Sequence, residues 1–236
     1  MISLNPFPFY SENIFIVKRV ILRILLVLSV LAVILGARIS YDLYRPYKID
    51  IRKFDADEVA RLDTAMWRSY YSRERLRMFG ELSELLEKQY ELPFWRRQLV
   101  AFYAAKAAFV FKDGKSREDY EKALPEVEKF YGEIHDISAT DFDVHRAAQL
   151  ELEWWIVHRQ RKQYKDGDLA KALAEAAGAL YNLPAERFAE YGEARAEAMK
   201  IRDDNAETGG VSEEDWQRID ELLHRSWRSL HEEVTR

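Results

Sequence analysis

An unbroken apolar run near the N-terminus constrains this chain more than any other feature of its sequence. Residues 20–37 read VILRILLVLSVLAVILGA, and Arg23 is the only charged residue among them. As an α-helix this segment spans about 27 Å, which is roughly the thickness of the hydrocarbon core of a bilayer. Arg23 lies one turn from the end of the run, where its side chain can reach the headgroups. We therefore predict a transmembrane anchor helix over residues 18–45 that contacts the lipid bilayer through residues 20–37.

An apolar run of this kind has two alternative interpretations. A cleaved signal peptide usually has a shorter apolar core, and no small-x-small cleavage site follows this one. A buried helix of a soluble domain would carry a polar stripe, and the run has none. The sequence favours an uncleaved, single-pass anchor.

The charges on either side of the run bear on the orientation in the membrane. The N-terminal side carries Lys18, Arg19 and Arg23, and the C-terminal side carries five basic residues, namely Arg38, Arg45, Lys48, Arg52 and Lys53. The larger number would place the C-terminal side in the cytoplasm. A short N-terminal tail with three positive charges resists translocation, which argues for the reverse. The two arguments nearly cancel, and our interpretation places the soluble domain outside the cytoplasm.

The remainder of the chain predicts an all-α domain. The whole chain has only nine glycines and six prolines, and most segments have helical periodicity in their apolar residues. The absence of cysteine excludes disulfides, thiolate catalysis and cysteine metal sites. The net charge of −5 and the lack of a basic block argue against a nucleic-acid partner.

Start and stop signals divide the chain into an N-terminal tail (1–17), the anchor (18–45), a linker (46–54) and a soluble α-helical domain (55–236). The capping signals predict the first helix of this domain from Asp55 to about Tyr90 and the second from Pro93 to Asp113. The remaining helices are expected from Ser116, with a break at Pro125, from Thr140 to about Lys165, over 168–181, over 184–205, and after a capping box at Ser212.

One pattern occurs twice. Phe111-Lys-Asp-Gly114 precedes Lys122-Ala-Leu124, and Tyr164-Lys-Asp-Gly167 precedes Lys171-Ala-Leu173. Each copy predicts a helix, a glycine-containing turn and a second helix. The pair resembles the hairpins of tetratricopeptide repeats, which implies a bundle of helical hairpins. The loops differ in length and the full repeat signature is not present, and any two antiparallel helices joined through Asp-Gly would give a similar pattern.

Several charged residues project onto the apolar faces of their predicted helices. Because unpaired buried charge costs several kcal/mol, we expect them to meet as one polar cluster. The candidates are Asp63, Glu74, Lys106, Glu151, His158, Arg195 and Arg202. The cluster is either a salt-bridge network that fixes helix register or a polar pocket that binds a ligand.

The segment from Trp95 to Phe111 is apolar on nearly every side, which predicts the most buried helix of the domain. Lys106 lies in its middle and is therefore predicted to be buried and paired with Glu151, or else with Asp63 or Glu74.

No catalytic signature accompanies these residues. Phosphate loops, nucleophile elbows, His-Glu-x-x-His and dinucleotide fingerprints are all missing, and Glu221-Leu-Leu-His224 is a lone Glu-x-x-His. We therefore expect no cofactor and no metal site. The sequence favours a membrane-tethered binding or scaffold domain, an accessory subunit with a protein partner. The alternative is a membrane-bound enzyme or small-ligand receptor that uses the polar cluster.

Overall fold

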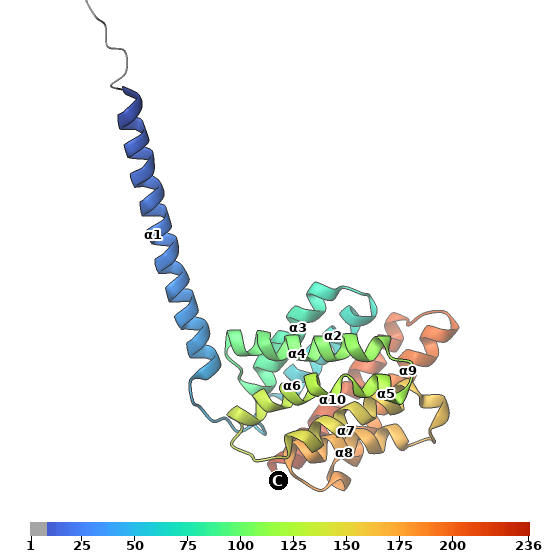
Figure 1. Cartoon of the computed structure of the whole chain (residues 1–236). Helices are drawn as coiled ribbons and strands as arrows, with labels where there is room; N and C mark the ends of the chain where they lie inside the picture. Colours follow the sequence, from blue (N-terminus) through green and yellow to red (C-terminus); the bar gives the residue numbers. More distant parts are fainter. Residues whose placement is uncertain (1–8) are drawn as a thin grey trace, which may run out of the picture. The chain divides into compact units, whose positions relative to one another are not determined.

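The computed structural model of the chain describes residues 9–236, with side chains described from residue 15 onward (Figure 1). The chain divides into two compact units, one ending at Arg45 and the other running from Pro46 to Arg236. The described residues form α-helices, short 3-10 helices and no strand, and a single isolated bridge joins Ile49 to Ser138. The all-α prediction is confirmed.

The first unit is one long helix, α1 (Phe9–Tyr44). It extends further toward the N-terminus than the predicted anchor, so that of the predicted tail (1–17) residues 9–17 are helical and residues 1–8 lie outside the described residues. Its segment Phe15–Tyr44 is long and apolar enough to cross a membrane, and its most apolar stretch is not buried by the rest of the chain. A signal sequence near an N-terminus can also meet this criterion of length and apolar composition.

The second unit holds the remaining helices, whose ends agree in part with the sequence signals. The α-helices are α2 (Ala56–Tyr71), α3 (Arg75–Tyr90), α4 (Phe94–Asp113), α5 (Arg117–Glu121), α6 (Leu124–Ile137), α7 (Val144–Arg159), α8 (Asp168–Tyr181), α9 (Ala189–Thr208) and α10 (Glu213–Thr235). The 3-10 helices are η1 (Arg161–Gln163) and η2 (Ala185–Phe188). Ser212 and Asp215 form the predicted capping box, and a break precedes Pro125 as expected.

The predicted single helix from Asp55 to Tyr90 is wrong, because the chain reverses within it. Helix α2 ends at Tyr71, and α3 begins at Arg75 and packs back on α2. Arg73 adopts a left-handed conformation with φ of 62° in the turn between them. Neither glycine nor proline marks this turn, and the apolar periodicity continues through it, so the local pattern resembles one uninterrupted helix.

Two smaller predictions are also corrected. Helix α7 is capped by Asp143, whose carboxylate accepts the amide of Arg146, and not by Thr140. The predicted linker over 46–54 belongs to the domain, since Ile51 is fully buried in the core and Ile49 bonds with the backbone of Ile137 and Ala139.

The helices of the second unit pack as a succession of neighbours. Each of α2, α3, α4, α6, α7, α8, α9 and α10 contacts the next, and α10 also packs against α2. Helices α8 and α9 approach so closely at Gly192 that a Cβ atom there would lie 2.1 Å from the carbonyl oxygen of Ala170. The core includes the fully buried aromatic rings of Tyr181 and Phe188, which stack on each other.

The prediction that α4 is the most buried helix is wrong. It packs on α3 and α6 through Val100, Ala101 and Ala107, while the side chains of Phe102 and Phe109 are each 53% exposed. Apolar residues on all sides normally mark a central helix, but here only one side is covered. Helix α4 therefore carries an uncovered apolar face.

Candidate functional site

The seven predicted cluster residues are distributed over separate places in the domain. Asp63 and Arg195 form one pair, and His158 and Arg202 share a partner on α9. Glu151, Lys106 and Glu74 each lie elsewhere with other partners. The expectation of one common cluster is corrected, because the helices that carry these residues are not all neighbours.

The Asp63–Arg195 pair is the most deeply buried ion pair of the domain. Arg195 on α9 donates from Nη1 to the Asp63 carboxylate on α2 at 2.5 Å, and Asp63 is only 1% exposed. Trp227 of α10 donates its indole N–H to the same carboxylate at 2.8 Å. The guanidinium also lies 5.4 Å and 5.8 Å from the ring centroids of Trp67 and Trp227. These contacts tie three helices together.

The electrostatic environment favours the charged form of Arg195. Burial opposes the charge on Arg195, but the nearby Asp63 carboxylate raises the guanidinium pKa above its usual value. With its charge balanced by Asp63 and its rim filled by tryptophan rings, the pair leaves no charge available to a ligand. Its contacts join α2, α9 and α10.

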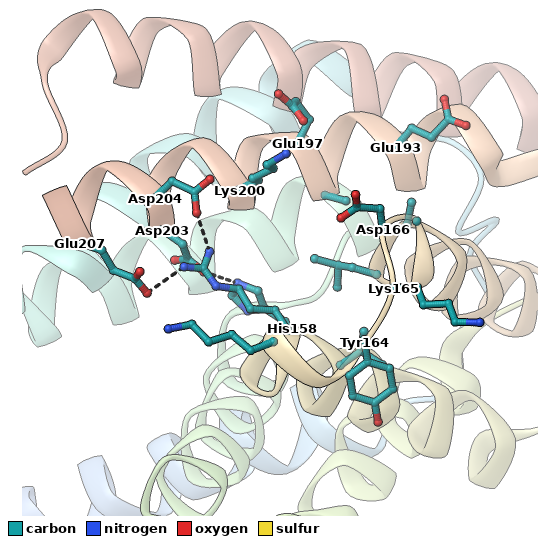
Figure 2. A pocket seen from close by; sticks show the side chains of 17 residues that line it. His158, Tyr164, Lys165, Asp166, Glu193, Glu197, Lys200, Asp203, Asp204 and Glu207 are labelled. Carbon is teal, nitrogen blue, oxygen red and sulfur yellow. Dashed lines mark hydrogen bonds and ion pairs between the residues drawn. The ribbon is translucent and has the colours of Figure 1, made fainter.

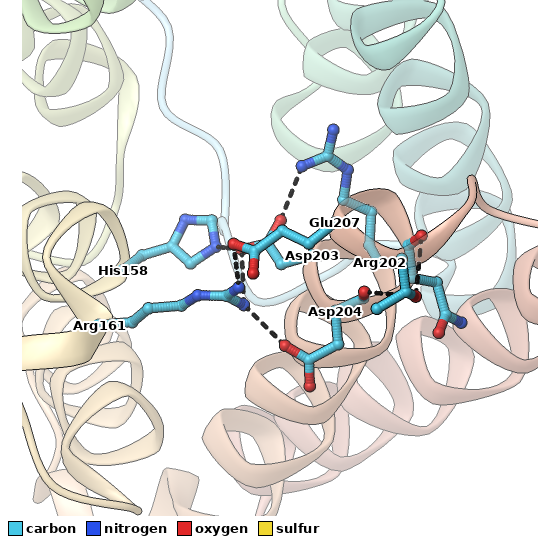
Figure 3. Close-up of polar contacts among 8 residues, drawn as sticks. His158, Arg161, Arg202, Asp203, Asp204 and Glu207 are labelled. Carbon is cyan, nitrogen blue, oxygen red and sulfur yellow. Dashed lines mark hydrogen bonds and ion pairs between the residues drawn. The ribbon is translucent and has the colours of Figure 1, made fainter.

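His158 and Arg202 meet through Asp203, a residue that the sequence did not single out (Figure 3). His158 Nε2 lies 2.9 Å from Asp203 Oδ2, and Arg202 donates to Oδ1 at 2.7 Å. Burial raises the pKa of Asp203, while the hydrogen bonds from His158 and Arg202 lower it, and the net effect is a lowered pKa. Arg202 also lies over the ring of Tyr71, whose pKa burial raises to about 12.

Arg161 extends this network at its solvent edge. Its guanidinium reaches Asp203 at 3.4 Å, Asp204 at 3.1 Å and Glu207 at 2.8 Å (Figure 3). The 3-10 helix η1 places Arg161 opposite the last turns of α9, so the contacts join the end of α7 to α9. The network therefore joins α7 and η1 to α9 through ion pairs between basic side chains and carboxylates.

An open pocket of about 660 Å³ adjoins this network. The end of α7, the loop over 164–167 and the start of α8 form one side, and α9 forms the other (Figure 2). Its acidic side chains include Asp166, Glu193 and Glu197, and Lys165 and Lys200 also line it. Within the described residues, no group of three or more histidine, aspartate or glutamate side chains is placed to hold a metal ion.

Glu151 and Glu74 have local partners. Glu151 accepts hydrogen bonds from the Tyr131 hydroxyl at 2.9 Å and the Trp155 indole at 3.0 Å. Burial and the Glu151 charge raise the pKa of Tyr131 well above its usual value. Glu74 is exposed at the start of α3 and contacts Arg77 at 3.3 Å, because the chain reverses just before it.

The predicted pair of Lys106 with Glu151 is wrong. Lys106 is 48% exposed on the side of α4 that faces solvent, and its amine contacts Glu126 of α6 at 2.8 Å. Lys129 contacts the same carboxylate oxygen at 2.9 Å. The two hydrogen bonds lower the pKa of Glu126 against the opposing effect of its burial.

We expect Lys106→Met to lower the free energy of unfolding by less than about 1 kcal/mol, because half-exposed ion pairs contribute little. Lys129→Met serves as the matched control and should have an equally small effect. The double variant should lose more than the sum of the two, since it leaves the enclosed Glu126 carboxylate with neither cation. Urea titrations of the four proteins measure this, and a large loss from Lys106→Met alone would contradict it.

Comparison with protein-family models, with curated proteins and with solved structures gives no significant match to the chain. The structural class of this protein is therefore described from its fold and its polar contacts alone. The chain is an all-α protein in which a long apolar helix precedes a helical domain whose internal charges pair with one another.

Proposed function

We propose that this is a single-pass membrane protein whose helical domain binds a protein partner, as an accessory or scaffold subunit of a membrane-associated assembly. The observation that carries the proposal is where the domain leaves large apolar side chains uncovered. All of those in the second unit lie between the end of α2 and the end of α4, namely Tyr70, Leu76, Phe94, Phe102 and Phe109. Large apolar side chains that a domain leaves exposed together in one region mark an interaction site more often than a catalytic one.

The anchoring rests on α1. Its segment Phe15–Tyr44 has the length and hydropathy of a membrane span, and the side chains of Tyr41 and Tyr44 suit the headgroup region at its end. The basic residues Lys18, Arg19 and Arg23 at the N-terminal end of the apolar run support a domain outside the cytoplasm. A tetratricopeptide-like arrangement of the hairpins belongs to the same proposal, although α10 packs back on α2, whereas in a solenoid each repeat contacts only its neighbours.

The turn between α2 and α3 offers a surface for the protein partner. Leu76 is 91% exposed in the first turn of α3, and Tyr70 is exposed at the end of α2. Arg68 on the same helix is held by Glu213 at 2.7 Å, and the ring of Tyr70 packs edge-on against Tyr71. This turn therefore presents apolar side chains on a supported backbone, which suits contact with another protein.

A photo-reactive residue at Leu76 tests this proposal in native membranes. We expect one adduct of defined mass, recovered in the membrane pellet after carbonate extraction, and a weaker adduct when Tyr70→Ser is added. The matched control places the same residue at Glu190, an exposed position on α9. Equal adducts from both positions would contradict a specific partner at the turn, and recovery of the protein in the supernatant would contradict the anchor.

A small-ligand receptor is the second candidate, and the pocket beside Arg161 favours it. Its volume of about 660 Å³ is in the range of ligand sites. Arg161→Gln would remove three ion pairs from its wall and should change ligand binding there if the pocket is used. Arg161 is already bound to three carboxylates of α9, so we rank the receptor below the scaffold.

A further inference from the structure

We propose that the outer face of α4 rests on the surface of the bilayer that holds α1, with its aromatic side chains at the boundary between headgroups and acyl chains. The outer face is defined by Trp95, Phe102, Ala105 and Phe109, with Lys106 at its border. The inference rests on the proposed anchoring of α1. Of the two exposed apolar surfaces, the outer face of α4 would then contact lipid. The turn between α2 and α3 would remain available to a protein partner.

The first reason is the shape of the outer face. Trp95, Phe102 and Phe109 follow one another at intervals of seven residues, which places them on one line along the helix, about 10 Å apart. Phe102 and Phe109 are each 53% exposed, and the opposite side of α4 packs on α3 and α6. A line of aromatic side chains on a packed helix can meet a flat surface along its whole length at once.

The second reason is charge. Lys106 and Lys112 are exposed on α4, where Asp113 is the only acidic residue. Arg96 and Arg97 do not add to this charge, because Arg96 is buried and paired with Glu133 and Arg97 is paired with Glu87. Lys129 of α6 lies over the ring of Tyr103 and adds another cation beside the face. The Glu126 carboxylate at this border is enclosed and already bound by two lysines.

Basic side chains beside aromatic and aliphatic ones are the composition of helices that lie in the interface of anionic membranes. The aromatic rings fit the headgroup boundary, and the lysines reach the lipid phosphates. An apolar groove of a protein would match the rings equally well. It would not account for the three exposed lysines on α4 and α6, two of which share one carboxylate.

The third reason is the short connection to the anchor. Helix α1 ends at Tyr44, and Ile49 is already bonded to the backbone at the end of α6. The intervening chain spans at most about 17 Å when extended. Within this stretch the ring of Tyr47 lies under the guanidinium of Arg96, in the first turn of α4, at 5.8 Å. The first turn of α4 is thus packed against the segment by which the chain enters the domain.

Spin labels test the proposal in the full-length protein, since the chain has no cysteine to remove. The reporter is Ala105→Cys, which lies between Phe102 and Phe109 on the outer face and leaves both rings in place. Leu28→Cys in α1 is the control for the span, and Glu221→Cys on α10, where the side chain is 67% exposed, is the control for water. Each labelled protein is reconstituted in vesicles of phosphatidylcholine with or without phosphatidylglycerol, and the label's collisions with oxygen and with a polar nickel chelate are compared.

We expect the label at residue 105 to collide more with oxygen than with the nickel chelate, as the label at 28 does, while the label at 221 shows the reverse. Phosphatidylglycerol should strengthen this preference and high salt should weaken it. Phe102→Ser with Phe109→Ser should return the label at 105 to water without changing the helical content, since both rings are half exposed.

Three results would overturn the proposal in distinguishable ways. A label at 105 that behaves like the one at 221, with the label at 28 in the acyl region, refutes the docking and leaves the anchor intact. Water exposure at residue 28 refutes the anchoring on which both proposals rest. Dipolar broadening at 105 that disappears on dilution with unlabelled protein shows that a second copy, and not lipid, covers the face.

Discussion

Asp63→Asn is expected to lower the free energy of unfolding by about 3–5 kcal/mol, the largest loss among the ion pairs of the domain. The substitution preserves the shape of the side chain but removes its charge, and Arg195 then remains buried without a counter-ion. The pair joins α2 to α9, and Trp227 of α10 bonds with the same carboxylate. One substitution therefore weakens three helices at once.

An exposed ion pair of the same helix, α2, supplies the control. Arg228 of α10 contacts Asp57 of α2 at 2.6 Å, with both side chains exposed. Asp57→Asn removes a similar charge pair in water and should have a much smaller effect. Urea denaturation of the full chain in detergent, followed by circular dichroism, compares the two variants. Equal losses of unfolding free energy would show that burial of the Asp63–Arg195 pair does not increase its contribution to stability.

The combined variant Asp63→Leu with Arg195→Met separates loss of the pair from exposure of a stranded charge. Replacing both partners by apolar side chains removes the unpaired cation, so much of the lost stability should return. No recovery would mean that the hydrogen bond from Trp227 and the packing of the guanidinium against Trp67 dominate instead.

Gly192→Ala is expected to cost about 3 kcal/mol, because α8 and α9 touch at this residue. The added Cβ would lie 2.1 Å from the carbonyl oxygen of Ala170 and 3.0 Å from its carbonyl carbon, both of which are backbone atoms. A flexible side chain could move aside, but a helix backbone moves only with its whole packing. The packing of Leu173, Ala194 and Ala198, which belong to one cluster of buried apolar residues, should loosen with it.

Gly132→Ala is the matched control, since Gly132 lies inside α6 and no neighbouring segment comes within 4 Å of the place that an added Cβ would occupy. Alanine has the higher helix propensity, so this variant should gain about 0.5–1 kcal/mol. Thermal unfolding of both proteins under the same conditions measures the opposite signs. A Gly192→Ala protein as stable as the original would show that α8 and α9 can separate without cost.

Several features of this protein follow from the sequence alone because they are local. Helix periodicity and the near absence of glycine and proline predicted an all-α chain, and capping residues such as Ser116 and Ser212 placed helix starts correctly. The apolar run identified α1, whose segment Phe15–Tyr44 could span a membrane. Each of these signals depends on residues within a few positions of one another.

The partners of charged residues were decided by the tertiary structure. Projection onto a helix face indicated that Asp63 and Arg195 point inward, and they meet across 132 positions of sequence. The same projection could not distinguish Glu126 from Glu151 as the partner of Lys106, because it gives a direction and not a neighbour. It also missed Asp203, which joins His158 to Arg202.

Helix α4 shows most clearly what the sequence determined and what the fold decided. Its sequence makes it apolar on nearly every side, but one helix cannot specify how many neighbours will cover it. The chain reverses at Arg73, where the sequence has neither glycine nor proline, and α3 packs back on α2. Helix α4 then packs on α3 and α6, and its other side stays exposed. Burial depends on the whole set of helix contacts, which is why Phe102 and Phe109 face outward despite a sequence typical of a core.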